Sequence, residues 1–168
     1  IGNIIKSLKI NIEGNNFDNI FINDINYSNG LYTDKINSNV SRVSAISDVR
    51  SKMVNIQQYL AKNNNVVCEG RDIGTVVFPN AEYKFFLKAS IKSRTNRRYL
   101  EMKKIDPLIT KTKIKYLLKN RDNKDINRIE SPLKKAKDAI IVVTTNISLN
   151  EQMNFIYNKI KIGTKNDK

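Results

Sequence analysis

Three short, largely apolar runs constrain the fold of this chain more than any other feature of its sequence. They are VVC at 66–68, EYKFFLKA at 82–89 and AIIVVT at 139–144, and segments with helical periodicity separate them. Runs of this kind indicate strands that are buried on both faces. Strands that alternate with helices form a parallel sheet covered by those helices. The sequence therefore predicts an α/β protein, and 168 residues are enough for one domain with a sizeable core.

Around these runs the sequence predicts a small β element and several helices. Residues 1–33 alternate weakly in polarity, with turn signals at 14–16 and 28–30, which favours an antiparallel β element. Helices are predicted over 36–46, over 48–62 with Ser47 as cap, from Ser90 onward and over about 110–121. A last helix begins at the capping-box pair Ser148 and Glu151. Its predicted core face consists of Leu149, Met153, Ile156 and Ile160.

Composition excludes several kinds of chemistry. The chain has no histidine, which rules out Ser-His-Asp catalysis and histidine-based metal sites. The single Cys68 cannot form an internal disulfide or complete a structural zinc site, so we expect a reducing cytoplasm and a buried, unreactive thiol. No apolar run reaches the roughly 20 residues of a membrane span, so no membrane span is predicted. The formal net charge of +14 should attract polyanions such as nucleic acid, an anionic membrane or nucleotide phosphates.

The first candidate site is Arg71-Asp72, which glycines flank at the exit of the first apolar run. A surface ion pair in a turn would explain the pattern equally well. In open α/β sheets, however, ligands bind at the carboxyl ends of strands. Arg71 would then hold a phosphate with its planar fork, and Asp72 would accept a hydrogen bond from the ligand.

Two further clusters are rich in arginine. Arg121, Asp125 and Arg128 follow a helical spacing, which favours either a solvated ladder of ion pairs or a site for sugar hydroxyls and phosphates. Arg94, Arg97 and Arg98 lie on one predicted helix, either as a basic surface on which Glu101 pairs with Arg97 or as a clamp on transferring phosphate. Ser41 and Arg50 carry almost no signal by themselves.

Four segments together resemble bacterial cytidylate kinases. VCEGRDIGTVVFPNAEYKFFLKAS is similar to the family pattern GRD-x-GTVVFP, and RTNRRYLE resembles its arginine-rich lid. RDNKDINRIESPLKKAKDAI resembles the RD-x-x-D-x-NR segment, and INSNVSRVSAISDVR resembles a helix pair of the family. The four segments occur in the family's order and extend over nearly the whole chain.

The resemblance implies a fold and a division of the chain. The expected fold is a P-loop NTPase-type parallel sheet with helices on both faces, of the nucleoside monophosphate (NMP) kinase kind. Residues 1–64 would form the NMP-binding region, with a β-rich insert at about 5–37. Residues 65–90 would belong to the core, 91–128 to a helical lid with its flanking helices, and 129–168 to the core with a C-terminal helix.

The resemblance also implies a reaction, transfer of the γ-phosphoryl group of ATP to CMP or dCMP with Mg²⁺. Cytosine would be recognised by one set of residues and the rest of the two nucleotides by another. By motif, the cytosine set is Ser41, Arg50, Asp72 and Arg128. Arg71 would bind the monophosphate, Arg121 and Asp125 the pentose and phosphate, and Arg94, Arg97 and Arg98 the phosphates of ATP. No metal ligand on the chain is expected, and neither is a stable nucleic acid partner; the predicted state is a monomer.

One departure from the family pattern is clear, because no G-x-x-x-x-G-K-[ST] motif occurs in these 168 residues. In the family it precedes the region where this chain begins. The expectation is therefore an N-terminally truncated fragment, whose sheet exposes an apolar seam and which can be inactive alone. Two alternatives remain open at this point, a degenerate kinase-like domain that binds CMP and a basic RNA-binding module.

Overall fold

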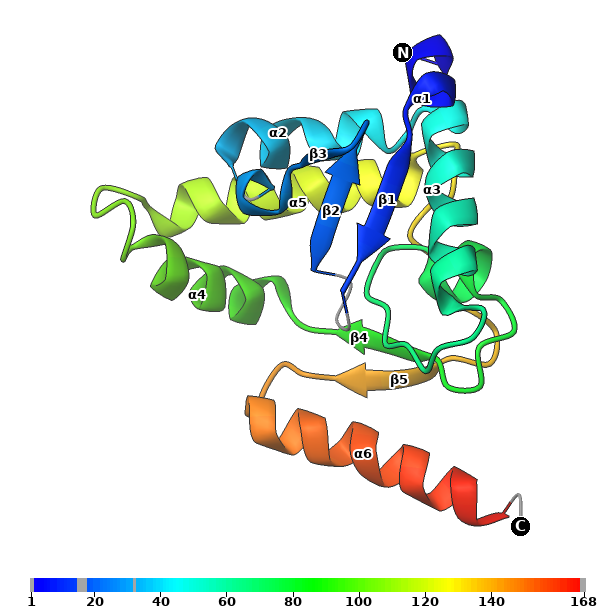
Figure 1. Ribbon diagram of the computed structural model, residues 1–168. Helices are drawn as coiled ribbons and strands as arrows, with labels where there is room; N and C mark the ends of the chain where they lie inside the picture. Colours follow the sequence, from blue (N-terminus) through cyan, green and yellow to red (C-terminus); the bar gives the residue numbers. More distant parts are fainter. Residues whose placement is uncertain (1, 15–17, 32, 167–168) are drawn as a thin grey trace. The chain divides into compact units, whose positions relative to one another are not determined.

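The computed structural model describes residues 2–14, 18–31 and 33–166 (Figure 1). The chain divides into two compact units. The first comprises Ile1–Glu69 and Arg128–Pro132, and the second comprises Gly70–Asn127 and Leu133–Lys168. Each unit is described by itself.

A three-stranded antiparallel sheet of order β1-β2-β3 confirms the predicted β element of the first unit. Its strands are β1 (Ile10–Glu13), β2 (Asn19–Ile22) and β3 (Ile25–Asn26). Asn23 and Asp24 connect β2 to β3 with positive φ angles of 48° and 66°, the backbone of a tight hairpin that Asn and Asp tolerate. This turn was not predicted from the sequence. Of the turn predicted at 14–16, Asn15 and Asn16 lie outside the described residues.

Helices complete the first unit: α1 (Gly2–Ser7), the 3₁₀ turn η1 (Ser28–Gly30), α2 (Asp34–Val43) and α3 (Ser47–Ala61). The ammonium of Lys52 on α3 donates 2.8 Å to the carbonyl of Ile5 and also to that of Leu8, so it satisfies carbonyls at the end of α1. Both predicted helices are present. The role predicted for Ser47 is wrong, because Ile46 occupies the cap position of α3 and no side chain caps that helix.

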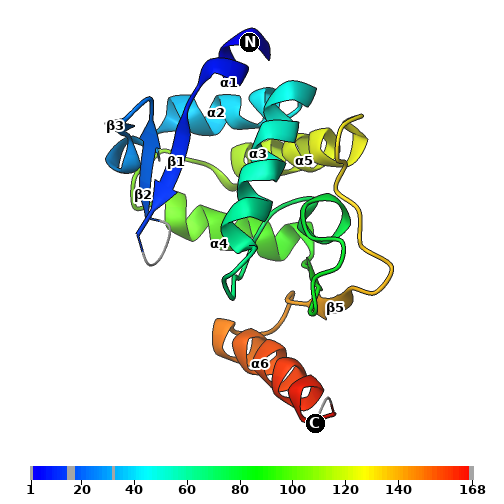
Figure 2. The ribbon, with the colours of Figure 1, turned by 45° about the vertical axis from the view of Figure 1, so that its right-hand side comes forward.

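A pair of parallel strands forms the centre of the second unit (Figure 1). β4 (Phe85–Lys88) pairs with β5 (Ile140–Val143), and Phe85 lies opposite Ile140. α4 (Ile91–Met102) and α5 (Lys111–Asn127) pack against each other, and α6 (Leu149–Asn166) lies on one side of β5 in both Figures 1 and 2. Two of the three predicted strands thus form the predicted parallel pair.

The third predicted strand, VVC at 66–68, is wrong. Residues 65–69 form no strand, Val67 is fully exposed and Cys68 is exposed rather than buried. An apolar run becomes a strand only when another strand edge accepts its hydrogen bonds. Within the described residues, β4 and β5 pair only with each other. Partial desolvation nevertheless raises the pKa of the Cys68 thiol, which disfavours the reactive thiolate.

The apolar surface of the second unit is only partly covered. Leu87, Ile141 and Val143 on the strand pair are exposed. The prediction for the last helix is wrong for three of its four positions, because Leu149, Met153 and Ile160 are exposed and only Ile156 is half-buried. Within the described residues, no helix combines the length and the apolar character that crossing a bilayer requires.

Candidate active site

The Arg71-Asp72 loop leads directly into a single π-helical turn, Ile73–Val77. The main-chain carbonyl of Asp72 accepts N–H bonds from Thr75 at 3.2 Å, Val76 at 2.8 Å and Val77 at 3.3 Å. Asp72 is only 3% exposed, and Val77, the last residue of the turn, is also buried. Isolated π turns occur frequently at functional sites. The turn therefore fixes the backbone of the residue predicted to read the base.

The side chain of Lys84, only 8% exposed, lies next to this turn. Lys84 lies just before β4, and its ammonium donates to the carbonyl of Pro79 and to Oδ2 of Asp138 at 2.6 Å. A Cβ built on Gly74 would lie 3.3 Å from Cδ of Lys84, so glycine at this position leaves room for the lysine stem. The hydrogen bond from Lys84 holds the pKa of Asp138 below its ordinary value. The pair links the start of β4 to the segment that enters β5.

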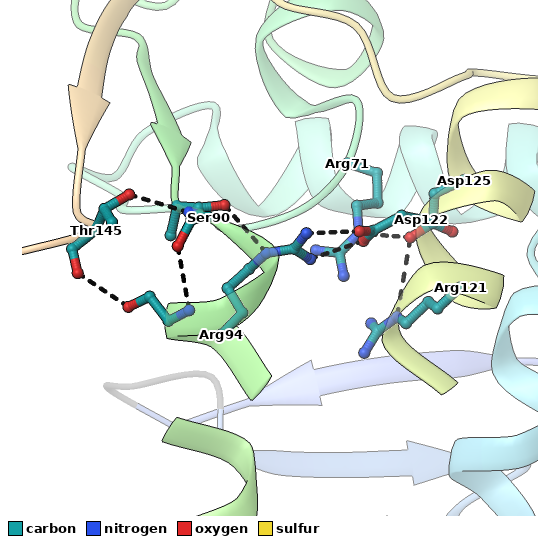
Figure 3. A network of polar contacts seen from close by, with 9 residues as sticks. Arg71, Ser90, Arg94, Arg121, Asp122, Asp125 and Thr145 are labelled. Atoms are coloured by element: carbon teal, nitrogen blue, oxygen red, sulfur yellow. Dashed lines mark hydrogen bonds and ion pairs between the residues drawn. The ribbon is translucent and has the colours of Figure 1, made fainter. Parts of the chain in front are cut away.

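Arg71 reaches from this loop to helix α5, as Figure 3 shows. Its Nε donates to Oδ2 of Asp125 at 2.8 Å, and the Asp125 side chain is only 7% exposed. Nε of Arg121, one turn earlier on α5, lies 3.8 Å from the same oxygen. One buried carboxylate is thus shared by two guanidinium groups. The structure brings together three residues that the sequence analysis assigned to the acceptor nucleotide.

A second arginine–carboxylate pair lies beside the first in Figure 3 and joins α4 to α5. Nη1 and Nη2 of Arg94 donate to Oδ1 and Oδ2 of Asp122 at 3.0 and 2.7 Å. Asp122 precedes Asp125 by one helical turn, so both carboxylates lie on one side of α5. Three guanidinium groups, those of Arg71, Arg94 and Arg121, therefore surround two carboxylates.

The start of α4 is attached to the carboxyl ends of both strands. The main-chain N–H of Ser90 donates 3.0 Å to Oγ1 of Thr145, and the Ser93 hydroxyl donates 3.0 Å to the Thr145 carbonyl (Figure 3). Arg97 donates to the carbonyl of Thr144, and its Nη1 lies 3.3 Å from Oγ1 of Thr144. The arginine cluster is consequently held at the strand edge where α/β proteins bind ligands.

Arg98 differs from the other arginines of α4. Nη1 of Arg98 donates to Glu101 at 2.9 Å, and more than half of each side chain is exposed. Glu101 thus pairs with Arg98 and not with Arg97, the partner that the basic-surface alternative gave it. An exposed ion pair of this kind contributes little to stability.

The remaining predicted residues belong to the first unit. Ser41 lies in α2, with its side chain outside the described part, and Arg50 lies half-buried in α3. Arg128 follows the end of α5, and its Nε donates 2.6 Å to the carbonyl of Ser131, which has a φ of 50°. The expectation that Arg121, Asp125 and Arg128 share one helix is wrong for Arg128, because α5 ends at Asn127.

Three residues of this region were not predicted as site residues from the sequence: Lys84, Asp122 and Thr145. Asp122 had a detectable signal, since it lies next to Arg121 and one helical turn before Asp125 in a segment already under consideration. The two others are recognisable only once β4 and β5 are adjacent. Among the described residues, no group of three or more carboxylates or cysteines could hold a metal ion.

A cluster of arginines at the carboxyl edge of parallel strands is the arrangement of an enzyme that handles phosphate groups. A family model described as cytidylate kinase matches residues 1–162. The chain is 43% identical over 157 residues to a cytidylate kinase of Fusobacterium nucleatum, covering 94% of this chain and 71% of that relative. It is 40% identical over 158 residues to one of Clostridium botulinum (strain Okra), again covering 94% and 71%. A cytidylate kinase of Flavobacterium psychrophilum is 41% identical over 140 residues, 83% of this chain and 62% of that relative.

The chain belongs to the cytidylate kinase family. It is accordingly a phosphotransferase, and the predicted fold class, the P-loop NTPase-type α/β fold of NMP kinases, is confirmed. The interpretation as a basic RNA-binding module is not supported.

Proposed function

We propose that this protein transfers the γ-phosphoryl group of ATP to CMP or dCMP, giving CDP or dCDP and ADP. The observation that carries the proposal is the contact of Arg71 with Asp125, which joins the loop of Asp72 to helix α5. Phosphoryl transfer depends on positioning and positive charge more than on a strong base, so a chain without histidine is suited to it.

The acceptor nucleotide would be bound through its phosphate, its sugar and its base. Arg71 binds the monophosphate with its planar fork, and Arg121 and Asp125 bind the pentose and its phosphate. Asp72 accepts a hydrogen bond from the exocyclic amine of cytosine, and Arg50, Arg128 and Ser41 complete recognition of the base. Uracil presents a carbonyl where cytosine has the amine, so it would place an acceptor against a carboxylate.

The donor nucleotide would be met by the arginines of α4. Arg94, Arg97 and Arg98 place positive charge where it opposes the charge of the transferring group. Mg²⁺, when bound, neutralises charge on the donor phosphates. The exposed side chain of Arg98 can swing to the donor, whereas Arg97 and Arg94 are already held by Thr144 and Asp122. A cytoplasmic, monomeric enzyme is part of this proposal.

The test is the substitution Arg71→Met in the enzyme expressed from its whole gene. We expect the KM for CMP to rise and transfer to slow, each roughly ten- to a hundredfold, because a charge-assisted hydrogen bond contributes about 1.5–3 kcal/mol. Lys9→Met is the matched control, because Lys9 makes an exposed ion pair with Asp24 and has no role in the proposed site. Near-normal kinetics of the Arg71 variant would contradict the phosphate role, and a wild-type enzyme that binds CMP without forming CDP would contradict the proposed reaction.

A further inference from the structure

The pair formed by Arg94 and Asp122 has a geometry that an incidental surface contact lacks. Both terminal nitrogens of the guanidinium donate, each to its own carboxylate oxygen, at 3.0 and 2.7 Å. The side chains are only 34% and 30% exposed. Two parallel bonds fix the plane of the guanidinium as well as its position. Asp122 therefore determines how Arg94 is oriented.

The contacts of Arg94 leave part of its donor capacity available. A guanidinium has five N–H donors. Arg94 uses two of them for Asp122, and its Nε–H donates to the carbonyl of Ala89 at 3.3 Å. Three of the five donors are thus used by these bonds and two are not. Asp122 can hold the arginine while the other two N–H groups bind a phosphate oxygen.

Helix α4, which carries Arg94, is itself held in place by other contacts, so the Arg94–Asp122 pair connects two helices, α4 and α5, that are each positioned. The Ser90 N–H and the Ser93 hydroxyl tie the start of α4 to Thr145, beyond β5 (Figure 3). Asp122 extends from α5, one helical turn before the carboxylate that holds Arg71. Arg71 and Arg94, which the proposed function assigns to the two nucleotides, are therefore positioned by neighbouring carboxylates on one helix.

We propose that Asp122 is a positioning residue for phosphoryl transfer, which acts by holding the guanidinium of Arg94 in the orientation that receives the charge of the transferring group. The inference rests on the proposed function, because it requires Arg94 to face the donor phosphates. Asp122 itself need not contact either nucleotide. Its removal should therefore slow turnover without weakening CMP binding.

The experiment compares Asp122→Asn with wild type in the enzyme expressed from its whole gene, with CMP and ATP–Mg²⁺ varied separately. We expect kcat to fall roughly 10- to 100-fold, because a misplacement of about 1 Å near the chemistry costs on the order of 100-fold. The KM for CMP should stay within about twofold of wild type. Asp24→Asn is the matched control, since it neutralises an exposed aspartate in the Lys9 ion pair and should leave kcat unchanged.

A double-mutant comparison separates action through Arg94 from an independent effect of Asp122. In an Arg94→Met background, Asp122→Asn should change kcat less than threefold. Arg94→Lys keeps the positive charge but cannot form the bidentate contact, so it should reproduce the kcat loss of Asp122→Asn. Its thermal unfolding midpoint should stay close to that of wild type. This variant also tests the inference if Asp122→Asn does not fold. Turnover is measured at a temperature where circular dichroism shows every variant to be folded, so that a purely stabilising role would leave kcat unaffected.

Two results would overturn the inference: a normal kcat in Asp122→Asn or Arg94→Lys, or an equal effect of Asp122→Asn with and without Arg94. Failure of the proposed function has a different signature. If wild type forms CDP and Arg71→Met impairs CMP capture while Asp122→Asn is normal, only the role of Asp122 is wrong. If wild type forms no CDP from CMP and ATP, the proposed function fails, and the role of Asp122 fails with it.

Discussion

Arg71 and Asp125 are 54 positions apart in the sequence, yet Nε of the first donates to Oδ2 of the second at 2.8 Å. The Asp125 side chain is almost completely buried and the Arg71 side chain is about one-third exposed. The residue proposed to bind the phosphate and the residue proposed to bind the sugar are thus in direct contact.

The buried carboxylate of this contact should matter for stability as well. We expect Asp125→Asn to lower the free energy of unfolding by about 1–3 kcal/mol, because it leaves the Arg71 guanidinium without its charged partner. Urea unfolding at neutral pH measures the change. Glu101→Gln is the control: it breaks the exposed Arg98 pair and should cost less than about 0.5 kcal/mol. Equal effects of the two substitutions would show that burial of Asp125 does not strengthen its contact.

Base selectivity should depend on Asp72. Asp72→Ala removes the acceptor proposed for the cytosine amine, so we expect the preference for CMP over UMP in kcat/KM to fall roughly ten- to a hundredfold. The main-chain bonds to the Asp72 carbonyl do not involve its side chain, so the π turn should persist. Competition between the two nucleotides in one reaction measures the preference. An unchanged preference would exclude Asp72 from base recognition.

The capping box of α6 should stabilise the protein through Ser148. Its hydroxyl accepts from the N–H of Glu151 at 3.2 Å, and the Glu151 carboxylate accepts from the N–H of Ser148 at 2.7 Å. We expect Ser148→Ala to cost about 1 kcal/mol in chemical unfolding. Ser47→Ala offers a matched control, because no side chain caps α3 and the cost should be a few tenths of a kcal/mol at most. A larger effect at Ser47 than at Ser148 would contradict this assignment of caps.

Acid should weaken the link between Lys84 and Asp138. The hydrogen bond from Lys84 lowers the pKa of Asp138 in the folded state, so this carboxylate contributes stability that is present above about pH 4 and is lost as pH falls through the lowered pKa. We expect Asp138→Asn to be less stable than wild type at pH 7 and the difference to shrink toward pH 2. Urea unfolding across that pH range gives the comparison. Lys84→Met should show the same convergence, and a difference that is independent of pH would contradict the linkage.

The sequence predicted those elements whose signals are local. Ser90 and Ser148 cap their helices as expected, because an N-cap bond depends on residues three positions apart. The apolar runs around Phe85 and Ile141 form the predicted parallel pair. The prediction of a strand at Val67 is wrong because a strand also needs a neighbouring strand edge as partner, and the sequence of one segment does not specify that partner.

The candidate site was predictable only in part for the same reason. The motif resemblance selected Arg71, Arg121 and Asp125, which the structure brings together. It did not select Asp122 or show that Arg94 is already paired, because that contact depends on how α4 packs against α5. Charge spacing along one helix gave no information about a partner on another helix.

The two strands of the β4–β5 pair are far apart in the sequence, and this affects the order in which the protein folds during its synthesis. Phe85 pairs with Ile140, 55 positions later, whereas α4 and α5 are consecutive helices joined by a short connection. Contacts that close a long loop carry a larger entropic cost and form more slowly than local ones. During translation, the α4–α5 hairpin can therefore form before β5 has left the ribosome. The arginine-bearing helices α4 and α5 would then pack together early. The β4–β5 pair, whose end binds the start of α4, would form only in the last stage of folding.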